Sequence, residues 1–190
     1  MGKIFFIFFQ AALLNNFILV RFLGLSPVFS ISTSYESSVG MGLTVTLVLF
    51  LTSMATWLVH YFILVPLQAD FLQLLSFLLI ITVIVQNLEK LIQNRYPGLK
   101  NLLGLYLPLL ATNCAILGLT LLNVIYEYNF FESILYSLGS GLGFTLSLIL
   151  MTSIRERLEQ SKVPIIFKGL PIIFISASIL SMAFVAFSSF

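Results

Sequence analysis

A single cysteine lies beside two polar side chains within a long apolar run. Cys114 is the only cysteine of the chain, and Thr112 and Asn113 come directly before it. A cysteine thiolate is a metal ligand, and neighbouring amide and hydroxyl groups can orient it or donate hydrogen bonds to its sulfur. Hydrocarbon offers polar groups no water, so these side chains must find protein partners, line a cavity or hold a cofactor.

A second polar break lies about one half-length earlier in the chain. Asn16 precedes Asn113 by 97 positions, and it also interrupts an apolar run. That run leads to Pro27, which lacks a backbone donor and disfavours helix at Ser26. The later break begins near Pro108. We therefore expect two interrupted helices, whose freed backbone groups are satisfied inside the protein.

The cysteine has two alternative interpretations. In the simpler one, Cys114 is a small buried apolar side chain. In the other, it is a metal ligand, but an iron–sulfur cluster needs about four ligands. One cysteine cannot hold a cluster alone, so any cluster here must be shared with another chain or with a second copy of this one.

The composition defines the class of protein. Hydrophobic residues make up 59% of the chain, charged residues 8%, and the mean hydropathy is +1.10. A soluble domain carries about 25% charged residues. The apolar runs are continuous for about 20 residues, as in membrane-spanning helices, and do not alternate as barrel strands do. We expect an all-α integral membrane protein, and a net charge of +2 gives no indication of nucleic-acid binding.

Six membrane-spanning helices are expected, joined by short loops. Their approximate ranges are residues 4–25, 39–57, 71–88, 102–122, 134–154 and 170–187. With six spans, both termini lie on one face of the membrane together with the loops after the second and fourth spans.

The distribution of basic residues predicts the orientation. The face with the termini carries Lys3 alone. The opposite face carries eight basic residues: Arg21, Lys90, Arg95, Lys100, Arg155, Arg157, Lys162 and Lys168. Even without Arg21, which could lie within the membrane, seven remain against one. The positive-inside rule therefore places these loops in the cytoplasm and both termini outside. Arg155, Glu156 and Arg157 at the end of the fifth span are either ordinary flanking charges or a docking site for a partner.

The two halves of the sequence resemble each other. The segment from Gly40 to Leu49 shares two glycines, three leucines and a threonine with the segment from Gly139 to Leu148, at an offset of 99. Because three spans separate equivalent points, a duplication would be inverted, with repeats at residues 1–95 and 96–190. Inverted repeats often place a site near the bilayer midplane, where interrupted helices meet.

Three segments carry a resemblance to a known family. They run from Asn15 to Leu25, from Leu107 to Gly118 and from Ile154 to Leu158. They are similar to the family that includes the A subunit of the Rnf (Rsx) complex and the E subunit of the sodium-translocating NADH:quinone reductase, Nqr. The resemblance covers essentially the whole chain, and the Thr-Asn-Cys-Ala-Ile-Leu-Gly stretch is its most specific motif.

The resemblance implies a role in an oxidoreductase complex. In this family the subunit pairs with a homologous six-helix subunit of opposite topology (RnfE or NqrD), alongside other Rnf subunits. Cysteines from the first and fourth spans of each subunit hold a shared 2Fe-2S cluster. Electron transfer of the ferredoxin or NADH class is coupled to sodium or proton translocation. Cys114 matches one family cysteine, and Asn16, Thr112 and Asn113 would be supporting groups around the ligands.

The chain departs from the family pattern at Ser26, which stands where the family has its other cysteine. A serine oxygen is a harder ligand than a thiolate. Ser26 could ligate iron weakly, the cluster could be held by three thiolates, or electron transfer could be impaired. We favour a retained cluster with altered ligation.

Two other functions remain open on the residues alone. A small secondary transporter would use the same inverted repeat and broken helices, with Asn16 and Asn113 lining a site without metal. The second of these is a purely structural role in the membrane. The chain by itself shows no self-contained catalytic motif, so enzymatic activity would belong to the assembled complex.

Overall fold

The computed structural model describes residues 2–14, 16–26, 35–68, 70–95, 110, 113–161, 164 and 167–188. This part of the chain is helical and contains no strand. Its elements are α1 (Gly2–Phe9), the π-helix η1 (Gln10–Leu14), α3 (Tyr35–Val59), the π-helix η2 (His60–Leu64), α4 (Val65–Leu67), the 3-10 turn η3 (Asp70–Leu72), α5 (Gln73–Arg95), α8 (Cys114–Ile125), α9 (Phe130–Glu159) and α10 (Leu170–Ser188).

Among the described residues, three helical segments are long and apolar enough to cross a membrane. They are Tyr35–Leu67, Gln73–Leu91 and Phe130–Leu158, and two shorter apolar helices cover Cys114–Ile125 and Leu170–Ala186. The expected all-α fold is confirmed for the described residues, and the length and apolar composition of these helices fit the expected membrane protein. The segments correspond to the expected second, third and fifth spans. At the expected first span, helical structure stops at Leu14 and turns follow over residues 17–21. Most of residues 102–112 lie outside the described residues.

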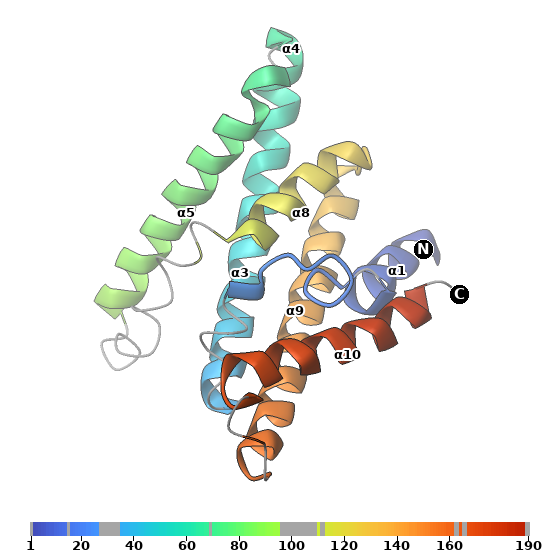
Figure 1. The fold of residues 1–190 in the computed structure, drawn as a ribbon. Helices are drawn as coiled ribbons and strands as arrows, with labels where there is room; N and C mark the ends of the chain where they lie inside the picture. The colour runs from blue at the N-terminus through green and yellow to red at the C-terminus, as the bar shows by residue number, and fades with distance from the viewer. Residues whose placement is uncertain are drawn as a thin grey trace.

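Helices α3 and α9 form the centre of the fold and run side by side in opposite directions (Figure 1). Small residues let them approach closely. A Cβ built on Gly42 would lie 2.6 Å from the Thr145 side chain, and one built on Gly141 would lie 2.6 Å from the Thr46 side chain. The two threonine hydroxyls are 3.5 Å apart. Gly42 and Thr46 correspond to Gly141 and Thr145 by the offset of 99. The two contacts are therefore equivalent, because in each the glycine of one half packs against the threonine of the other half.

Polar side chains inside this helix pair are satisfied mainly by one another and by the backbone. Ser38 Oγ and Thr152 Oγ1 lie 2.6 Å apart at one end of the pair. Further along, Ser53 Oγ lies 2.8 Å from Ser133 Oγ, and Asn123 of α8 donates to Ser53 at 2.9 Å. Such bonds fix how α3, α8 and α9 pack, because hydrocarbon supplies no other partners.

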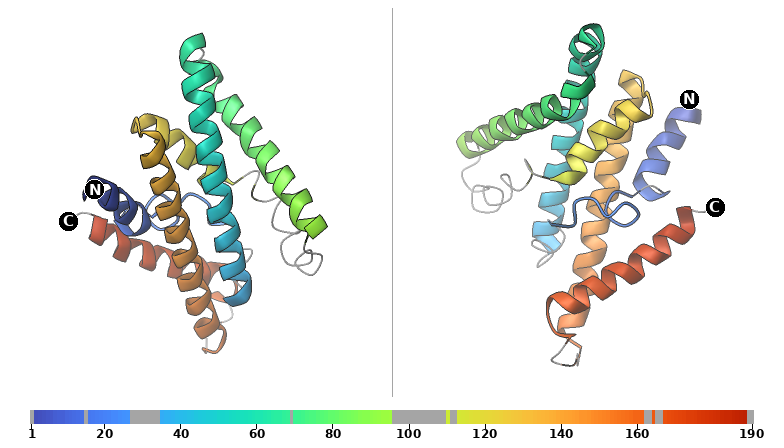
Figure 2. Two further views of the ribbon diagram at one scale, coloured as in Figure 1. Left: turned by 180° about the vertical axis from the view of Figure 1, so that it is seen from behind. Right: turned by 45° about the horizontal axis from the view of Figure 1, so that its top comes forward.

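The remaining helices surround this pair. Helices α3 and α5 meet at α4 and diverge from there, while α1 and α10 lie on the opposite side of the molecule (Figures 1 and 2). Ser181 of α10 donates a hydrogen bond to the Leu19 carbonyl, so α10 also contacts the segment after η1.

The position of Arg21 differs from the expectation. The count of basic residues places Arg21 with the loops of the opposite face. In the structure its Nη2 donates to Tyr126 Oη at 2.7 Å, and Tyr126 lies in the turn between α8 and α9. That turn belongs to the face assigned to the termini. The charge asymmetry of seven basic residues on the other face does not depend on Arg21.

Candidate functional site

Asn16 organises the segment that follows η1. Its side chain is fully buried, and its Oδ1 accepts hydrogen bonds from the Ile18 and Leu19 amides at 3.0 and 3.3 Å. The same oxygen accepts from Ser147 Oγ of α9 at 2.9 Å. The Nδ2 group donates to the Gly143 carbonyl at 2.8 Å. Asn16 therefore turns the chain and fastens this turn to α9.

Asn113 begins helix α8 in a comparable way. Its backbone is extended (φ −75°, ψ 115°), and its Oδ1 accepts from the Ala115 amide at 3.0 Å, as an N-cap does. The side chain is only 6% exposed. Its Nδ2 group is buried and has no hydrogen-bond partner among the described residues.

The two segments meet at Cys114. The backbone amide of Gly24 donates a hydrogen bond to Cys114 Sγ at 3.0 Å, across 90 residues of sequence. Gly24 has φ +78°, a conformation that favours glycine. A Cβ there would lie 3.0 Å from Phe144 Cε2 and 3.1 Å from Asn113 Oδ1. A glycine is thus required where the first segment reaches the sulfur.

Replacing Gly24 tests how tightly this contact is built. We expect Gly24→Ala to lower the stability of the assembled complex by about 2–3 kcal/mol, because it adds backbone strain and crowding against Phe144. The matched control is Gly169→Ala, where φ is +90° but a Cβ would meet nothing within 4 Å. This control measures the backbone strain alone, which we expect to lower the stability by about 1 kcal/mol. Thermal unfolding of the purified complex measures both, and equal losses would show that the contacts at Gly24 are not tight.

The Cys114 side chain is exposed on this chain, although its neighbours are buried. Ser26 is also exposed, two positions after Gly24. Thr112 lies outside the described residues. Arg155, Glu156 and Arg157 lie near the end of α9, about three turns beyond Phe144, so they are separate from the cysteine.

These residues can be tested against a 2Fe-2S cluster. Within the described part of the chain, no group of three or more His, Cys, Asp and Glu side chains could hold a metal ion. The chain offers one exposed sulfur, a backbone donor to that sulfur and a buried amide beside it. This fits half of a cluster site whose remaining ligands come from another subunit, and does not fit a cluster held by this chain alone.

Sequence reasoning missed the cluster of residues around Arg21. The Tyr126, Tyr128 and Tyr136 rings contact one another, with centroids 5.2–6.3 Å apart, and Arg21 bonds to the first of them. Burial raises the pKa of Tyr128, in the turn between α8 and α9, and Tyr126 and Glu132 add to the effect while Arg21 opposes it. The feature of the sequence that could have indicated this cluster is Arg21 itself, because it is an arginine within an apolar run.

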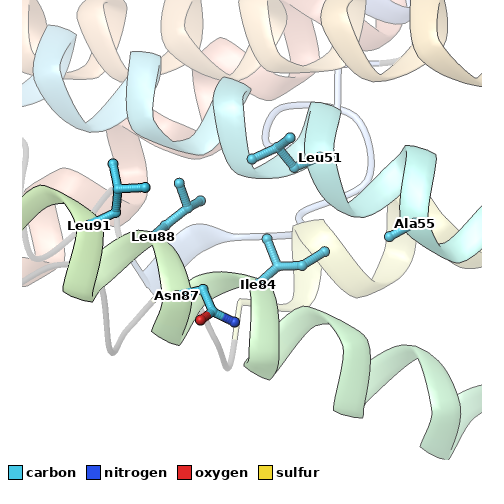
Figure 3. Close-up of a pocket in the computed structure, with 6 residues that line it drawn as sticks. All are labelled: Leu51, Ala55, Ile84, Asn87, Leu88 and Leu91. Atoms are coloured by element: carbon cyan, nitrogen blue, oxygen red, sulfur yellow. The ribbon is translucent and has the colours of Figure 1, made fainter.

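A groove between α3 and α5 has a different character (Figure 3). It has a volume of about 350 Å³ and is lined by Leu51, Ala55, Ile84, Asn87, Leu88 and Leu91. Its one polar side chain, Asn87, already donates to the Val83 carbonyl at 2.8 Å. The groove is therefore an apolar surface, and its lining side chains include no group that could act as a catalyst or a metal ligand.

Together these features define a helical membrane protein in which two irregular segments meet at an exposed cysteine. The model of the Rnf-Nqr subunit family, described as membrane proteins, matches residues 4–190. The chain belongs to this family, and the resemblance inferred from the sequence is confirmed.

Curated relatives agree over nearly the whole chain. The A subunit of the ion-translocating oxidoreductase complex of Cereibacter sphaeroides is 48% identical over 188 residues, covering 99% of this chain and 97% of the relative. Its counterpart of the same name in Tolumonas auensis is 48% identical, covering 94% and 93%. The A subunit of the Na(+)-translocating ferredoxin:NAD(+) oxidoreductase complex of Acetobacterium woodii is 47% identical, covering 96% and 95%.

Proposed function

We propose that this chain is the A subunit of an Rnf-type complex, a membrane-bound oxidoreductase that couples electron transfer to ion translocation. The names of relatives at 47–48% identity support this assignment. The observation that carries the site is the hydrogen bond from the Gly24 amide to Cys114 Sγ. It joins the two irregular segments at a sulfur that remains accessible to a partner.

The proposed site is half of a 2Fe-2S centre shared with a homologous subunit. Cys114 would hold iron through its thiolate, and Ser26 stands where the second ligand is expected. When bound, the cluster would accept and release single electrons. The residues of this chain position the thiolate: Asn113 caps the helix that carries it, and Gly24 donates to its sulfur. Asn16 fastens the first segment to α9, and Thr112 is assigned a supporting role next to Asn113.

The proposed architecture is six spans in two inverted three-helix repeats, with helices one and four interrupted. The reciprocal contacts of Gly42 with Thr145 and of Gly141 with Thr46 support a two-fold relation between α3 and α9. The matching roles of Asn16 and Asn113, each capping the backbone two residues ahead, support a second pair of equivalent positions.

The partner is proposed to be a homologous six-helix subunit of opposite topology, like RnfE or NqrD, which faces Cys114. Other Rnf subunits would contact the basic face, with Arg155, Glu156 and Arg157 as a docking segment. The complex would lie in a bacterial inner membrane with both termini of this chain outside. The donor and acceptor are of the ferredoxin and NADH class, and sodium or protons are the translocated ions.

A secondary transporter without a metal centre is the alternative. Its support is the burial of Asn16 and Asn113 in irregular segments, an arrangement that suits a substrate site between repeats. A transporter would hold no iron, so the iron content of the purified complex distinguishes the two proposals.

The test is the iron content of the complex purified from membranes. We expect Cys114→Ala to remove one 2Fe-2S EPR signal and about two iron atoms per complex, because a cluster rarely survives loss of a thiolate ligand. The control Ser178→Ala, at an exposed position of α10, should leave both unchanged. Ser26→Cys should change the iron occupancy or the reduction potential of that signal. Iron and EPR spectra that do not respond to Cys114→Ala would refute the cluster role.

A further inference from the structure

The irregular segment of residues 16–24 is bonded to both ends of α8. At the start of the helix, the Gly24 amide donates to Cys114 Sγ at 3.0 Å. At its other end, Arg21 Nη2 donates to Tyr126 Oη at 2.7 Å, and Tyr126 is the C-cap of α8. The helix between these two bonds has 12 residues and is therefore about 18 Å long.

The backbone of the segment is strained between the two bonds. Phe22 has φ +56°, in the left-handed region, where a bulky side chain costs about 1–2 kcal/mol. The Phe22 side chain is 52% exposed, so its packing within the chain offsets only part of that cost. A strained conformation persists only where the surrounding structure holds it. Here the Arg21 bond comes directly before the strained residue, and the Gly24 bond follows two positions after it.

The other hydrogen bonds of the segment do not hold this strained part against α8. Its first half is bonded to α9 and α10, through the Asn16 side chain and the Leu19 carbonyl. The Leu23 amide donates to a carbonyl of the same segment at 2.8 Å and so attaches it to no other helix. Among the described residues, the hydrogen bonds that attach residues 20–24 to another element come from Arg21 and Gly24.

We propose that Arg21 is a positioning residue for the Cys114 ligand: its bond to Tyr126 holds the strained turn, and the turn keeps the Gly24 amide on the sulfur. The inference rests on the proposed function. A hydrogen-bond donor to a ligating sulfur stabilises the extra negative charge of the reduced cluster, so it raises the reduction potential. Without the Arg21 bond, the strained turn would relax and move this donor away from the sulfur, and the potential would fall.

The test compares reduction potentials of the Cys114-dependent EPR signal in the purified complex. Tyr126→Phe removes the oxygen that accepts the bond but keeps the Arg21 charge, so its effect does not come from a lost charge. We expect the ratio of reduced to oxidised cluster at a fixed poise to fall about threefold, which is about 28 mV for a one-electron couple. Arg21→Ala should lower the ratio at least as much. The control Tyr61→Phe removes an exposed phenol of η2 and should leave the potential unchanged.

Relief of the strain provides a second, independent variant. Asparagine adopts positive φ more readily than phenylalanine, so Phe22→Asn added to Tyr126→Phe should restore at least part of the lost potential. A double variant with no recovery would refute the role of the strained turn. Equal potentials in wild type, Tyr126→Phe and Arg21→Ala, with iron retained, would refute the role of Arg21 and leave the proposed function intact. Absence of any Cys114-dependent cluster from the wild-type complex would instead refute the proposed function.

Discussion

Asn16→Leu should destabilise the complex by about 2–4 kcal/mol, the largest effect expected of a single side chain here. The side chain is fully buried, and its oxygen accepts hydrogen bonds from Ile18, Leu19 and Ser147. Leucine has a similar size but no polar atoms. It would leave the Ile18 and Leu19 amides without an acceptor, at about 1–3 kcal/mol for each group, whereas the Gly143 carbonyl would still accept from Ser147 Oγ at 3.0 Å. Hydrogen bonds between helices of membrane proteins contribute only about 0.6 kcal/mol on average. For this reason we expect the total loss of stability to be about 2–4 kcal/mol and not the full sum of the separate penalties.

The measurement is the thermal unfolding of the detergent-solubilised complex, with its abundance in membranes as a second readout. Asn87→Leu is the matched control, because Asn87 is exposed and donates only to Val83 in its own helix. It should change the stability by less than about 0.5 kcal/mol. If both variants were equally stable, Asn16 would not hold the first segment to α9.

Gly143→Val should also destabilise the complex strongly, because it disturbs the packing of η1 on α9. A Cβ on Gly143 would lie 2.5 Å from the Ala12 carbonyl oxygen and 3.2 Å from its Cα. These are backbone atoms, so no side-chain rotation can make room, and the first helix must move away from α9. We expect a loss of about 1–3 kcal/mol, as for overpacked cores. The Asn16 bond to the Gly143 carbonyl would lengthen as well.

Gly40→Val is the control for this substitution. Gly40 lies in α3, and a Cβ there would meet nothing within 4 Å. A side chain at this position should be neutral, or should stabilise the helix slightly because glycine is a poor helix former. Measured in the same unfolding assay, a Gly143→Val complex as stable as the Gly40→Val complex would show that η1 does not contact α9 as closely as the structure describes.

The comparison between Gly40 and Gly139 also shows where the resemblance of the two halves ends. The two glycines are equivalent by the offset of 99, but a Cβ on Gly139 would lie 2.6 Å from the Phe8 carbonyl oxygen, whereas Gly40 has open space. The repeated sequence pattern places both glycines at matching positions of the two halves. Only one of them packs against another helix among the described residues.

Much of the site could be recognised from the sequence because its signals are local. Polar residues next to Cys114 in an apolar run stand out without any knowledge of packing, and the Thr-Asn-Cys-Ala-Ile-Leu-Gly motif led to the family that the comparisons confirm. Gly24 lies in the segment from Asn15 to Leu25 that carries the family resemblance. Its contact with the sulfur was not predicted, because the sequence does not indicate which residue comes within hydrogen-bond distance of a cysteine 90 positions away.

The sequence by itself determined that this is a helical membrane protein, since an apolar run of about 20 residues that crosses lipid must be helical to satisfy its backbone. Its motifs indicated the Rnf-Nqr subunit family. Only the tertiary structure decided how the polar groups pair. It gives the Asn16 amide an acceptor on α9, leaves the Asn113 amide without one among the described residues, and brings Arg21 to the turn after α8. The physical reason is range: hydrophobicity acts on each segment separately, whereas a hydrogen bond depends on how helices distant in sequence pack to within about 3 Å.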